Sequence, residues 1–244
     1  MTLVKNVSNS MILCCGKLLD PMKDVLDVVR RARALVFDFD GTLVDSNPIK
    51  GRAFEICFAE FPDSRSEILA YCRGHNHLTR GEKFQYVYEQ ILGLPYTEEI
   101  AVELHRRFAV LTTDEIIAAP EIPGATRFLG LTAGSHRKAL LSNTPHPILA
   151  DIVLHRGWWD HFTAVQGAPV VKGEWLHDYR RHSGFDEHEI VFFGDTVEDA
   201  RAAGKAGCTF IAVGNSDLGT ACGHHIRDFT ELVPPGDRKV EQPS

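Results

Sequence analysis

The sequence lacks any apolar run that approaches the roughly 20 residues needed to cross a bilayer. The apolar stretch from Met11 to Cys15 is also shorter than the hydrophobic region of a secretory signal. We therefore expect no association with a membrane, and we expect a cytoplasmic protein.

Cysteine is sparse, and the six cysteines include no CxxC pair, so neither a disulfide framework nor a zinc site is indicated. Basic charge is also in deficit, because 26 lysines and arginines face 33 acidic residues, which gives a net charge of -7. The basic residues are dispersed along the chain, whereas a nucleic-acid surface needs them gathered into a patch. We expect a small-molecule partner, no nucleic acid, and a monomer or homodimer.

What the sequence does contain is enough apolar material, 44% of 244 residues, for an α/β domain with an insertion. The run at residues 34–37 is short, continuous and apolar, as in a strand buried on both faces of a parallel sheet. After residue 120, helical segments alternate with further strand-like runs at 138–141, 162–166, 190–193 and 209–213. This alternation predicts an α/β fold with a doubly wound parallel sheet, as in Rossmann-like cores.

Residues 47–119 read differently, because their apolar positions keep a helical period throughout and Pro120 and Pro123 close the block. The block therefore predicts an α-helical cap inserted after the first strand of the sheet. Residues 1–20 show no clear period, and an amphipathic helix follows Pro21. The predicted division is a leader at 1–32, a core at 33–46 and 120–233, a cap at 47–119, and a flexible tail at 234–244.

Polar groups follow the predicted strands, where the carboxyl ends of a parallel sheet bring distant residues together. They are Asp38 with Asp40, Ser142 with Asn143, Lys172, and Asp195 with Asp199. Such a set of carboxylates suits a hard divalent cation, and Mg²⁺ is expected because it binds a substrate phosphate beside one or two carboxylates.

The same residues suit phosphoryl transfer. Asp38 is the candidate nucleophile, and Asp40 is placed to protonate the leaving group and then to activate water. The Ser142 hydroxyl and the Lys172 ammonium can position and neutralise phosphate oxygens. Backbone N–H groups near Gly41 and Thr42 can add an anion site. The pattern therefore predicts an enzyme that removes phosphate from a small phosphorylated metabolite through an aspartyl-phosphate.

Three segments, together with Lys172, resemble the haloacid dehalogenase superfamily of phosphatases: VFDFDGTLVDS at 36–46, LLSNT at 140–144 and FFGDTVEDARAAGKAG at 192–207. The position and length of the cap are similar to those of the branch with phosphoglycolate phosphatase and β-phosphoglucomutase. The resemblance implies Asp38 as nucleophile and metal ligand, and Asp40 as acid and base with its backbone carbonyl on the metal. It further implies phosphate contacts from Ser142, Asn143 and Lys172, and magnesium sites at Asp195 and Asp199.

Two departures bear on these assignments. Gly173 follows Lys172 where many relatives have proline, so Lys138 and Lys205 remain alternatives to Lys172. The dehalogenases of the superfamily lack an aspartate two residues after the nucleophile, so Asp40 favours phosphate chemistry.

In the cap, the densest cationic cluster consists of Arg73, His75, Arg80 and Lys83, which are candidate substrate-binding residues. A plain connection between helices explains this segment equally well. Three other functions remain open. They are a phosphosugar mutase on the same core, a phosphonatase with a Schiff base on Lys50 or Lys83, and a non-catalytic metabolite-binding or regulatory subunit.

Overall fold

The computed structural model describes residues 12–14, 17–19, 21–76 and 78–234. Near its start, β1 (Ile12–Cys14) and β2 (Lys17–Leu19) form a two-stranded antiparallel sheet. The sequence did not predict this hairpin, because strands of three residues are too short to display a period of two. The predicted flexible tail lies outside the described residues except for its first residue.

The main sheet has six strands in the order β5-β4-β3-β6-β7-β8, and all of its neighbouring pairs are parallel. Its strands are β3 (Ala34–Phe37), β4 (Arg137–Pro145), β5 (Ala164–Ala168), β6 (Ile190–Gly194), β7 (Thr209–Val213) and β8 (His225–Ile226). The predicted α/β fold with a doubly wound parallel sheet is therefore confirmed. The short strand β8 was not predicted.

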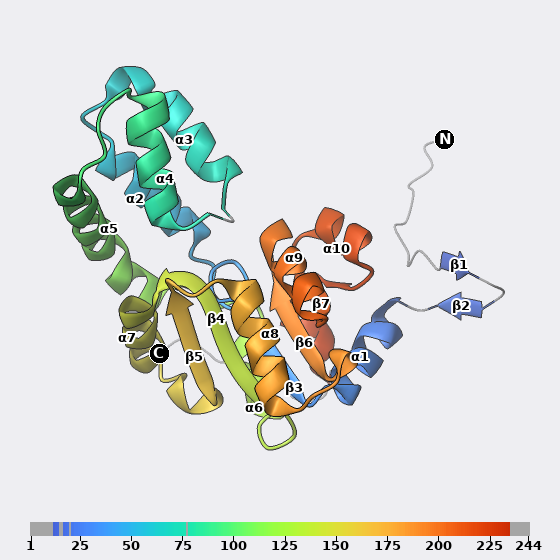
Figure 1. Cartoon of the computed structure of the whole chain (residues 1–244). Helices are drawn as coiled ribbons and strands as arrows, with labels where there is room; N and C mark the ends of the chain where they lie inside the picture. Colours follow the sequence, from blue (N-terminus) through green and yellow to red (C-terminus); the bar gives the residue numbers. More distant parts are fainter. Residues whose placement is uncertain (1–11, 15–16, 20, 77, 235–244) are drawn as a thin grey trace, which may run out of the picture.

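Helices cover both faces of this sheet (Figure 1). One face packs α1 (Pro21–Arg31), α6 (Ala125–Leu131) and α7 (His146–His155), and the other packs α8 (Lys172–Ser183), α9 (Val197–Ala206) and α10 (Ser216–Cys222). The described residues also include four short 3-10 helices: η1 (Pro62–Ser64), η3 (Trp159–His161), η4 (Glu187–Glu189) and η5 (Phe229–Leu232).

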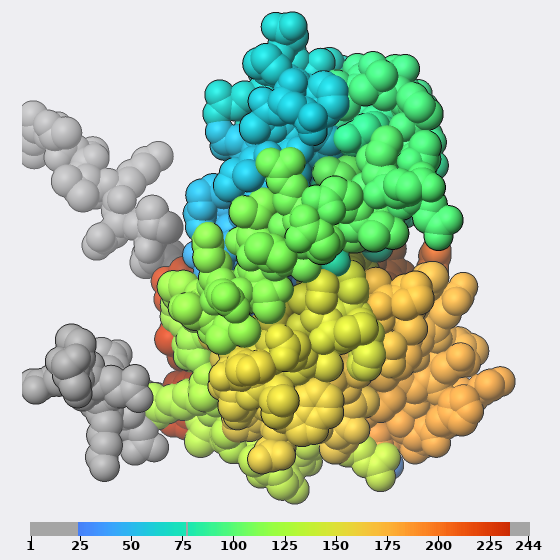
Figure 2. Space-filling view, turned by 90° about the vertical axis from the view of Figure 1, so that its left-hand side faces the viewer, coloured from blue at the N-terminus to red at the C-terminus, as the bar shows by residue number. Residues whose placement is uncertain are grey.

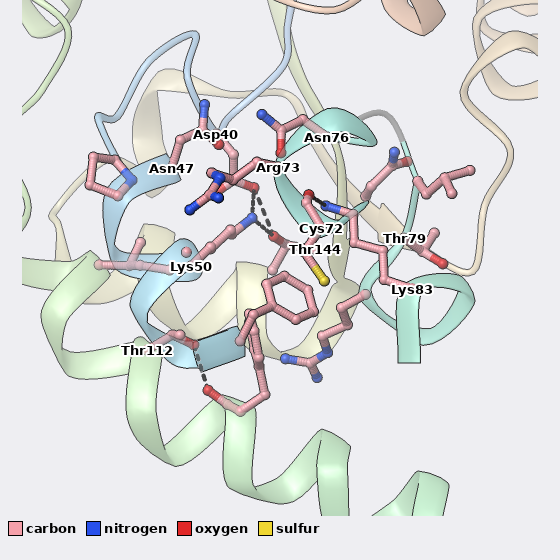
Figure 3. Close-up of a pocket in the computed structure, with 18 of the residues that line it drawn as sticks. Asp40, Asn47, Lys50, Cys72, Arg73, Asn76, Thr79, Lys83, Thr112 and Thr144 are labelled. Carbon is pink, nitrogen blue, oxygen red and sulfur yellow. Dashed lines mark hydrogen bonds and ion pairs between the residues drawn. The ribbon is translucent and has the colours of Figure 1, made fainter. Parts of the chain in front are cut away.

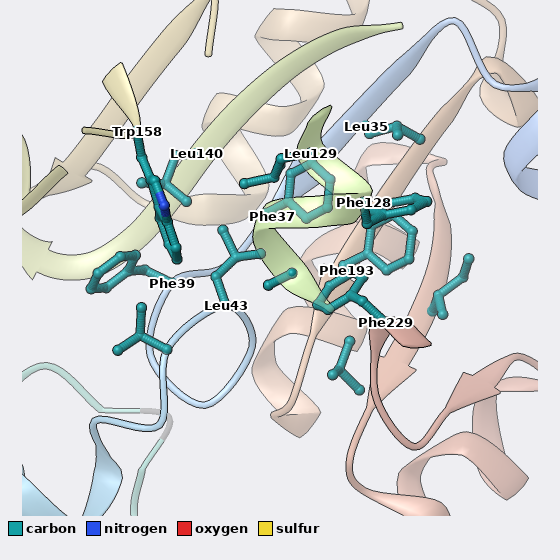
Figure 4. Packing of buried hydrophobic residues seen from close by; sticks show 14 of the residues in the cluster. Leu35, Phe37, Phe39, Leu43, Phe128, Leu129, Leu140, Trp158, Phe193 and Phe229 are labelled. Carbon is teal, nitrogen blue, oxygen red and sulfur yellow. The ribbon is translucent and has the colours of Figure 1, made fainter. Parts of the chain in front are cut away.

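The continuous apolar run of β3 is explained by this double coverage. Leu35 and Phe37 join the hydrophobic cluster on one face, whereas Ala34 and Val36 join the cluster on the other. Phe37 stacks on Phe193 of the neighbouring strand with ring centroids 5.0 Å apart (Figure 4). The strand that carries the candidate nucleophile is thus held in the centre of the core.

The helical block consists of α2 (Asn47–Cys57), α3 (Arg65–Gly74), α4 (Arg80–Tyr86), the π-helical turn η2 (Val87–Ile91) and α5 (Glu98–Ala118). These helices surround a separate hydrophobic cluster that includes Phe54, Phe84 and Phe108. They form a lobe above the core (Figures 1 and 2). The helical insertion expected from the sequence is therefore present, and we refer to it as the cap.

Two adjacent connections join the cap to the core. The N–H of Asp45 on the first donates to the carbonyl of Pro120 on the second, at 3.0 Å. The guanidinium of Arg156, after α7, donates to three carbonyls at the end of α5, those of Ile116, Ile117 and Ala119, at 2.8–2.9 Å. These contacts tie the base of the cap to the carboxyl edge of the sheet, where the candidate site lies.

Within the described part of the chain, no helix is both long and apolar enough to cross a membrane. Four cysteines there, Cys57, Cys72, Cys208 and Cys222, are free thiols, and the first three are buried.

Candidate active site

Three of the predicted carboxylates converge where β3 and β6 end. Asp38 directly follows β3, and its N–H donates to the carbonyl of Phe193 on β6 at 2.8 Å. Asp195 follows β6, and Asp199 lies in the first turn of α9. One oxygen from each of the three carboxylates lies within 4.8 Å of the other two. The topology of the sheet thus brings together side chains that are more than 150 positions apart in the sequence.

Gly41 keeps the loop after Asp38 close to this cluster. Its φ of +79° is in the left-handed region, and a Cβ atom there would lie 2.3 Å from Oδ2 of Asp195. The same atom would lie 2.5 Å from the side-chain nitrogen of Asn47. A side chain at position 41 would therefore displace a carboxylate of the site.

Burial is the main reason why the pKa values of two carboxyl groups in this cluster are raised. It raises the pKa of Asp38 to about 7, with further increases from Asp199 and Asp40 that the Lys172 ammonium opposes. Burial also raises the pKa of Asp195 to about 8, and the nearby Asp38 and Asp199 add to the effect. Oδ1 of Asp195 is buried without a hydrogen-bond partner among the described residues. Converging carboxylates and an unpaired buried oxygen fit a divalent cation with oxygen ligands.

Lys172 is the lysine that reaches these carboxylates. Its buried ammonium lies 2.8 Å from Oδ1 of Asp38 and 2.7 Å from Oδ1 of Asp199. Burial alone would lower the pKa of Lys172, but Asp199 and Asp38 reverse this effect and raise it. The two alternative lysines from the sequence do not take this position. Lys138 donates to the carbonyl of Leu129 at 2.7 Å, and Lys205 is exposed on α9. Gly173 after Lys172 therefore does not prevent this contact.

Asp199 differs from Asp195 in how its oxygens are used. Its Oδ2 accepts hydrogen bonds from the backbone N–H and the hydroxyl of Thr196, at 3.2 and 2.6 Å, in the capping box of α9. Its Oδ1 pairs with Lys172. Both oxygens are thus engaged, whereas Asp195 keeps a free one.

Asp40 lies in a dense hydrogen-bond network. Its Oδ1 accepts from the Ser46 hydroxyl at 2.6 Å, and its Oδ2 accepts from Thr144 at 2.8 Å and from Ser142 at 3.2 Å. The ammonium of Lys50, on the cap helix α2, lies 2.6 Å from the same Oδ2 and donates to Thr144 at 3.2 Å (Figure 3). Although burial would raise the pKa of Asp40, Lys50 and the hydroxyl donors lower it overall. Asp40 is therefore an ionised, ion-paired carboxylate here.

Sequence reasoning missed Thr144 and considered Lys50 only as a Schiff-base lysine. A usable signal was the spacing of Ser46 and Lys50 at the start of a helix, because residues four apart share one helical face. Both side chains contact Asp40.

A cavity of about 640 Å³ lies between the cap and this edge of the sheet. Asp38, Asp40, Ser142, Asn143, Lys172 and Asp195 line it from the core, and Lys50, Arg73, Arg80 and Lys83 line it from the cap. His75 is not among the described residues that line it. Its Nδ1 lies 2.8 Å from the carbonyl oxygen of Tyr71, and its ring stacks on the Tyr71 ring. Thr42 is fully buried beside the site, and its hydroxyl has no partner among the described residues.

Comparison with known proteins agrees with this arrangement. A family model described as haloacid dehalogenase-like hydrolase matches residues 32–207. The chain is 24% identical over 215 residues to a phosphoglycolate phosphatase of Salmonella typhimurium, which covers 77% of this chain and 83% of the relative. It is 26% identical over 218 residues to a phosphoglycolate phosphatase of Mannheimia succiniciproducens, with 81% and 95% covered.

Two solved structures share the fold. A predicted phosphoglycolate phosphatase from Haemophilus somnus superposes with a TM-score of 0.65 at 19% identity, covering 83% of this chain and 96% of the other. CbbY from Rhodobacter sphaeroides, in complex with xylulose-(1,5)bisphosphate, has a TM-score of 0.65 at 18% identity, with 82% and 96% covered.

Proposed function

The chain belongs to the haloacid dehalogenase-like hydrolases, and we propose that it is a magnesium-dependent phosphatase of a small phosphorylated metabolite. The observation that carries the proposal is the convergence of Asp38, Asp195 and Asp199 with Lys172. Of these four, Asp38, Asp195 and Lys172 line the floor of the cavity. Nucleophile, cation ligands and a phosphate-binding ammonium are the groups that phosphoryl transfer to a carboxylate requires. A sugar phosphate or a phosphoglycolate-like acid is the proposed class of substrate.

Asp38 and Asp40 divide the chemistry in this proposal. An oxygen of Asp38 attacks phosphorus and the ester bond to the leaving oxygen breaks, which gives an aspartyl-phosphate and an alkoxide. Asp40 protonates the alkoxide, then removes a proton from the water that attacks phosphorus and restores Asp38. Lys172 and the Ser142 hydroxyl hold the transferred phosphoryl oxygens.

A magnesium ion held by Asp38 and Asp195, with Asp199 beside them, would reduce the repulsion between the anionic nucleophile and the anionic phosphate.

Asp40 must carry a proton before it can act as an acid, yet Lys50 holds it ionised in this structure. A phosphate ester in the cavity competes for the Lys50 ammonium, because both anions are acceptors for the same cation. Separation of Lys50 from Asp40 removes the main interaction that lowers the pKa of Asp40. The proton donor is therefore prepared by substrate binding.

The proposed function is tested by incubating the protein and Mg²⁺ with p-nitrophenyl phosphate and with a panel of sugar phosphates and phosphorylated acids. We expect release of inorganic phosphate that stops on chelation. Conversion of one phosphate ester into another without release of inorganic phosphate would identify a mutase. No reaction with any ester would instead leave a binding or regulatory role.

Asp40→Asn should slow hydrolysis of alkyl phosphates by about 10²–10⁴-fold, the usual contribution of a general acid. The loss in the rate of p-nitrophenol formation should be smaller, because p-nitrophenolate leaves without a proton. Rates of formation of both alcohols, measured in a single turnover, check this expectation. Equal losses for the two types of ester would contradict the assignment of Asp40 as the acid.

Magnesium should stabilise the fold more at pH 8 than at pH 6. The pKa values of Asp38 and Asp195, about 7 and 8, exceed the ordinary value of 3.8, so the folded chain binds more protons than the unfolded chain across this range. Without metal, stability should therefore fall as pH rises from about 4 to 8. Metal ligands must be deprotonated, so Mg²⁺ offsets this loss most where both acids are ionised.

Melting temperatures with Mg²⁺ or with a chelator, at pH 6, 7 and 8, test the point. Asp195→Asn should abolish the magnesium-dependent shift, and Asp199→Asn should reduce it less, because both oxygens of Asp199 already have partners. A shift that is independent of pH, or equally lost in both variants, would contradict this site.

A further inference from the structure

Two cations in the cap wall of the cavity, the buried Lys83 and the partly buried Arg80, have no carboxylate partner among the described residues. The side chain of Lys83 is only 6% exposed, and its ammonium donates to the carbonyl of Cys72 at 3.1 Å (Figure 3). The Arg80 guanidinium donates to Nδ1 of His105 at 3.0 Å. In the described part of the chain, no carboxylate oxygen lies within 4.0 Å of the charged nitrogens of either residue.

Several other cations of the cap have carboxylate partners. Arg52, Arg65 and Arg106 form ion pairs with Glu115, Glu55 and Glu103, and these pairs are exposed. Lys50, which also lines the cavity from the cap, pairs with Asp40. Lys83 and Arg80 instead lie in the wall of the cavity, where water and ligands have access.

This burial carries a free-energy cost. It lowers the pKa of Lys83 to about 8 and that of Arg80 to about 10, because a low-dielectric environment disfavours a charge without a counter-ion. The ring faces of Phe54 and Phe108, 5.2 and 5.4 Å from the charged groups, offset part of this cost. An anion in the cavity would offset more.

A purely structural role explains part of the arrangement. Cys72 lies in the last turn of α3, where a lysine that donates to a carbonyl stabilises the helix end. This contact uses one of the three N–H donors of the ammonium, however, and leaves the others for the cavity. For Arg80, the contact with His105 uses Nε and leaves the two terminal nitrogens.

We propose that Lys83 and Arg80 form a subsite for a second anionic group, so that the substrate is a phosphomonoester with a carboxylate or a second phosphate at its other end. The proposal rests on the proposed function, since the ester phosphate has to occupy the floor beside Asp38 and Lys172. In this proposal the core groups bind the ester phosphate, and the two cap cations bind the anionic group at the other end of the substrate.

Binding by Asp38→Asn, chosen because it should not consume the ligand, tests the subsite. Calorimetry with Mg²⁺ compares two matched pairs of ligands. They are phosphoglycolate with the phosphate ester of glycolamide, in which the carboxylate is replaced by a neutral amide, and propane-1,3-diol bisphosphate with 3-hydroxypropyl phosphate. We expect tighter binding of at least one doubly anionic ligand by about 10- to 100-fold, the range for charge-assisted hydrogen bonds. The pair that shows the preference tells a carboxylate from a second phosphate.

Adding Lys83→Met should reduce this preference to less than about threefold, while binding of the neutral amide or monophosphate stays unchanged. Lys83→Arg should retain it, and Arg106→Met, which removes an exposed cap cation outside the cavity, should have no effect. Unchanged binding of the singly anionic ligands by Lys83→Met shows that its loss does not come from misfolding.

Equal affinity within both pairs would overturn the proposal, as would a Lys83→Met loss that is the same for charged and neutral ligands. If Lys83 formed an imine with a phosphonoaldehyde that borohydride reduces to a stable adduct, Lys83 would be an imine-forming lysine and the proposal would be overturned. Turnover of p-nitrophenyl phosphate by the unaltered chain tests the phosphatase separately. Selective binding without turnover would retain the subsite and reject the phosphatase.

Discussion

Asp38→Asn is expected to lower kcat by about 10³-fold or more for every phosphate ester, because an amide cannot attack phosphorus as a carboxylate does. The fold should persist, since the change removes one charge from a cluster in which three carboxylates repel one another. Lys172 keeps its second ion pair with Asp199. The measurement is kcat with saturating Mg²⁺, together with the melting temperature without metal.

The matched control is Asp160→Asn, which removes an exposed carboxylate in η3, outside the cavity. It should leave both quantities unchanged, as surface substitutions usually do within about 0.5 kcal/mol. A clean Asp38→Asn preparation with substantial turnover would mean that Asp38 is not the nucleophile.

Lys172→Met should damage both stability and catalysis. It leaves Asp38 and Asp199 without the cation that contacts them at 2.8 and 2.7 Å, and breaking such a buried pair costs about 3–5 kcal/mol. The cost should be larger at pH 8 than at pH 6, because Asp38, whose pKa is about 7, is then mainly ionised. Magnesium should restore part of the stability but little of the activity, since phosphate loses a direct donor.

Urea denaturation at both pH values, and kcat/KM with Mg²⁺, check this expectation. Lys205→Met is the control, because Lys205 is exposed on the neighbouring helix and was one of the two alternative candidates from the sequence. If Lys205→Met caused the larger loss of activity, the assignment of Lys172 would be wrong.

The strands that precede the candidate site could be predicted, because a strand buried on both faces has a continuous run of apolar residues in the sequence. Residues 34–37 and 190–193 are continuous apolar runs, and a candidate-site aspartate follows each of them, Asp38 directly and Asp195 after one glycine. The strand β4 was predicted to end at Leu141, yet it continues to Pro145. Its polar residues Ser142 and Thr144 contact Asp40, and these two polar positions interrupt the apolar pattern that marks a buried strand.

The rest of the site depends on geometry that no local pattern encodes. The contact between Lys50 and Asp40 requires α2 to turn back over the loop that carries Asp40, which depends on the packing of the cap on the core. In the cap, four cations looked equivalent in the sequence. Burial separates them, because Lys83 faces the cavity while His75 stacks on Tyr71.

Transfer of phosphate through Asp38, with Asp40 moving the protons, is tested most directly by rapid mixing of Asp40→Asn with p-nitrophenyl phosphate and Mg²⁺. Formation of the aspartyl-phosphate needs little acid catalysis with this ester, whereas its hydrolysis needs the base, so the intermediate should accumulate. We predict a burst of one p-nitrophenol per active site, and a phosphoryl group on Asp38 in peptides from acid-quenched protein. Steady release of p-nitrophenol without a burst, and with Asp38 unmodified, would contradict a covalent intermediate on Asp38.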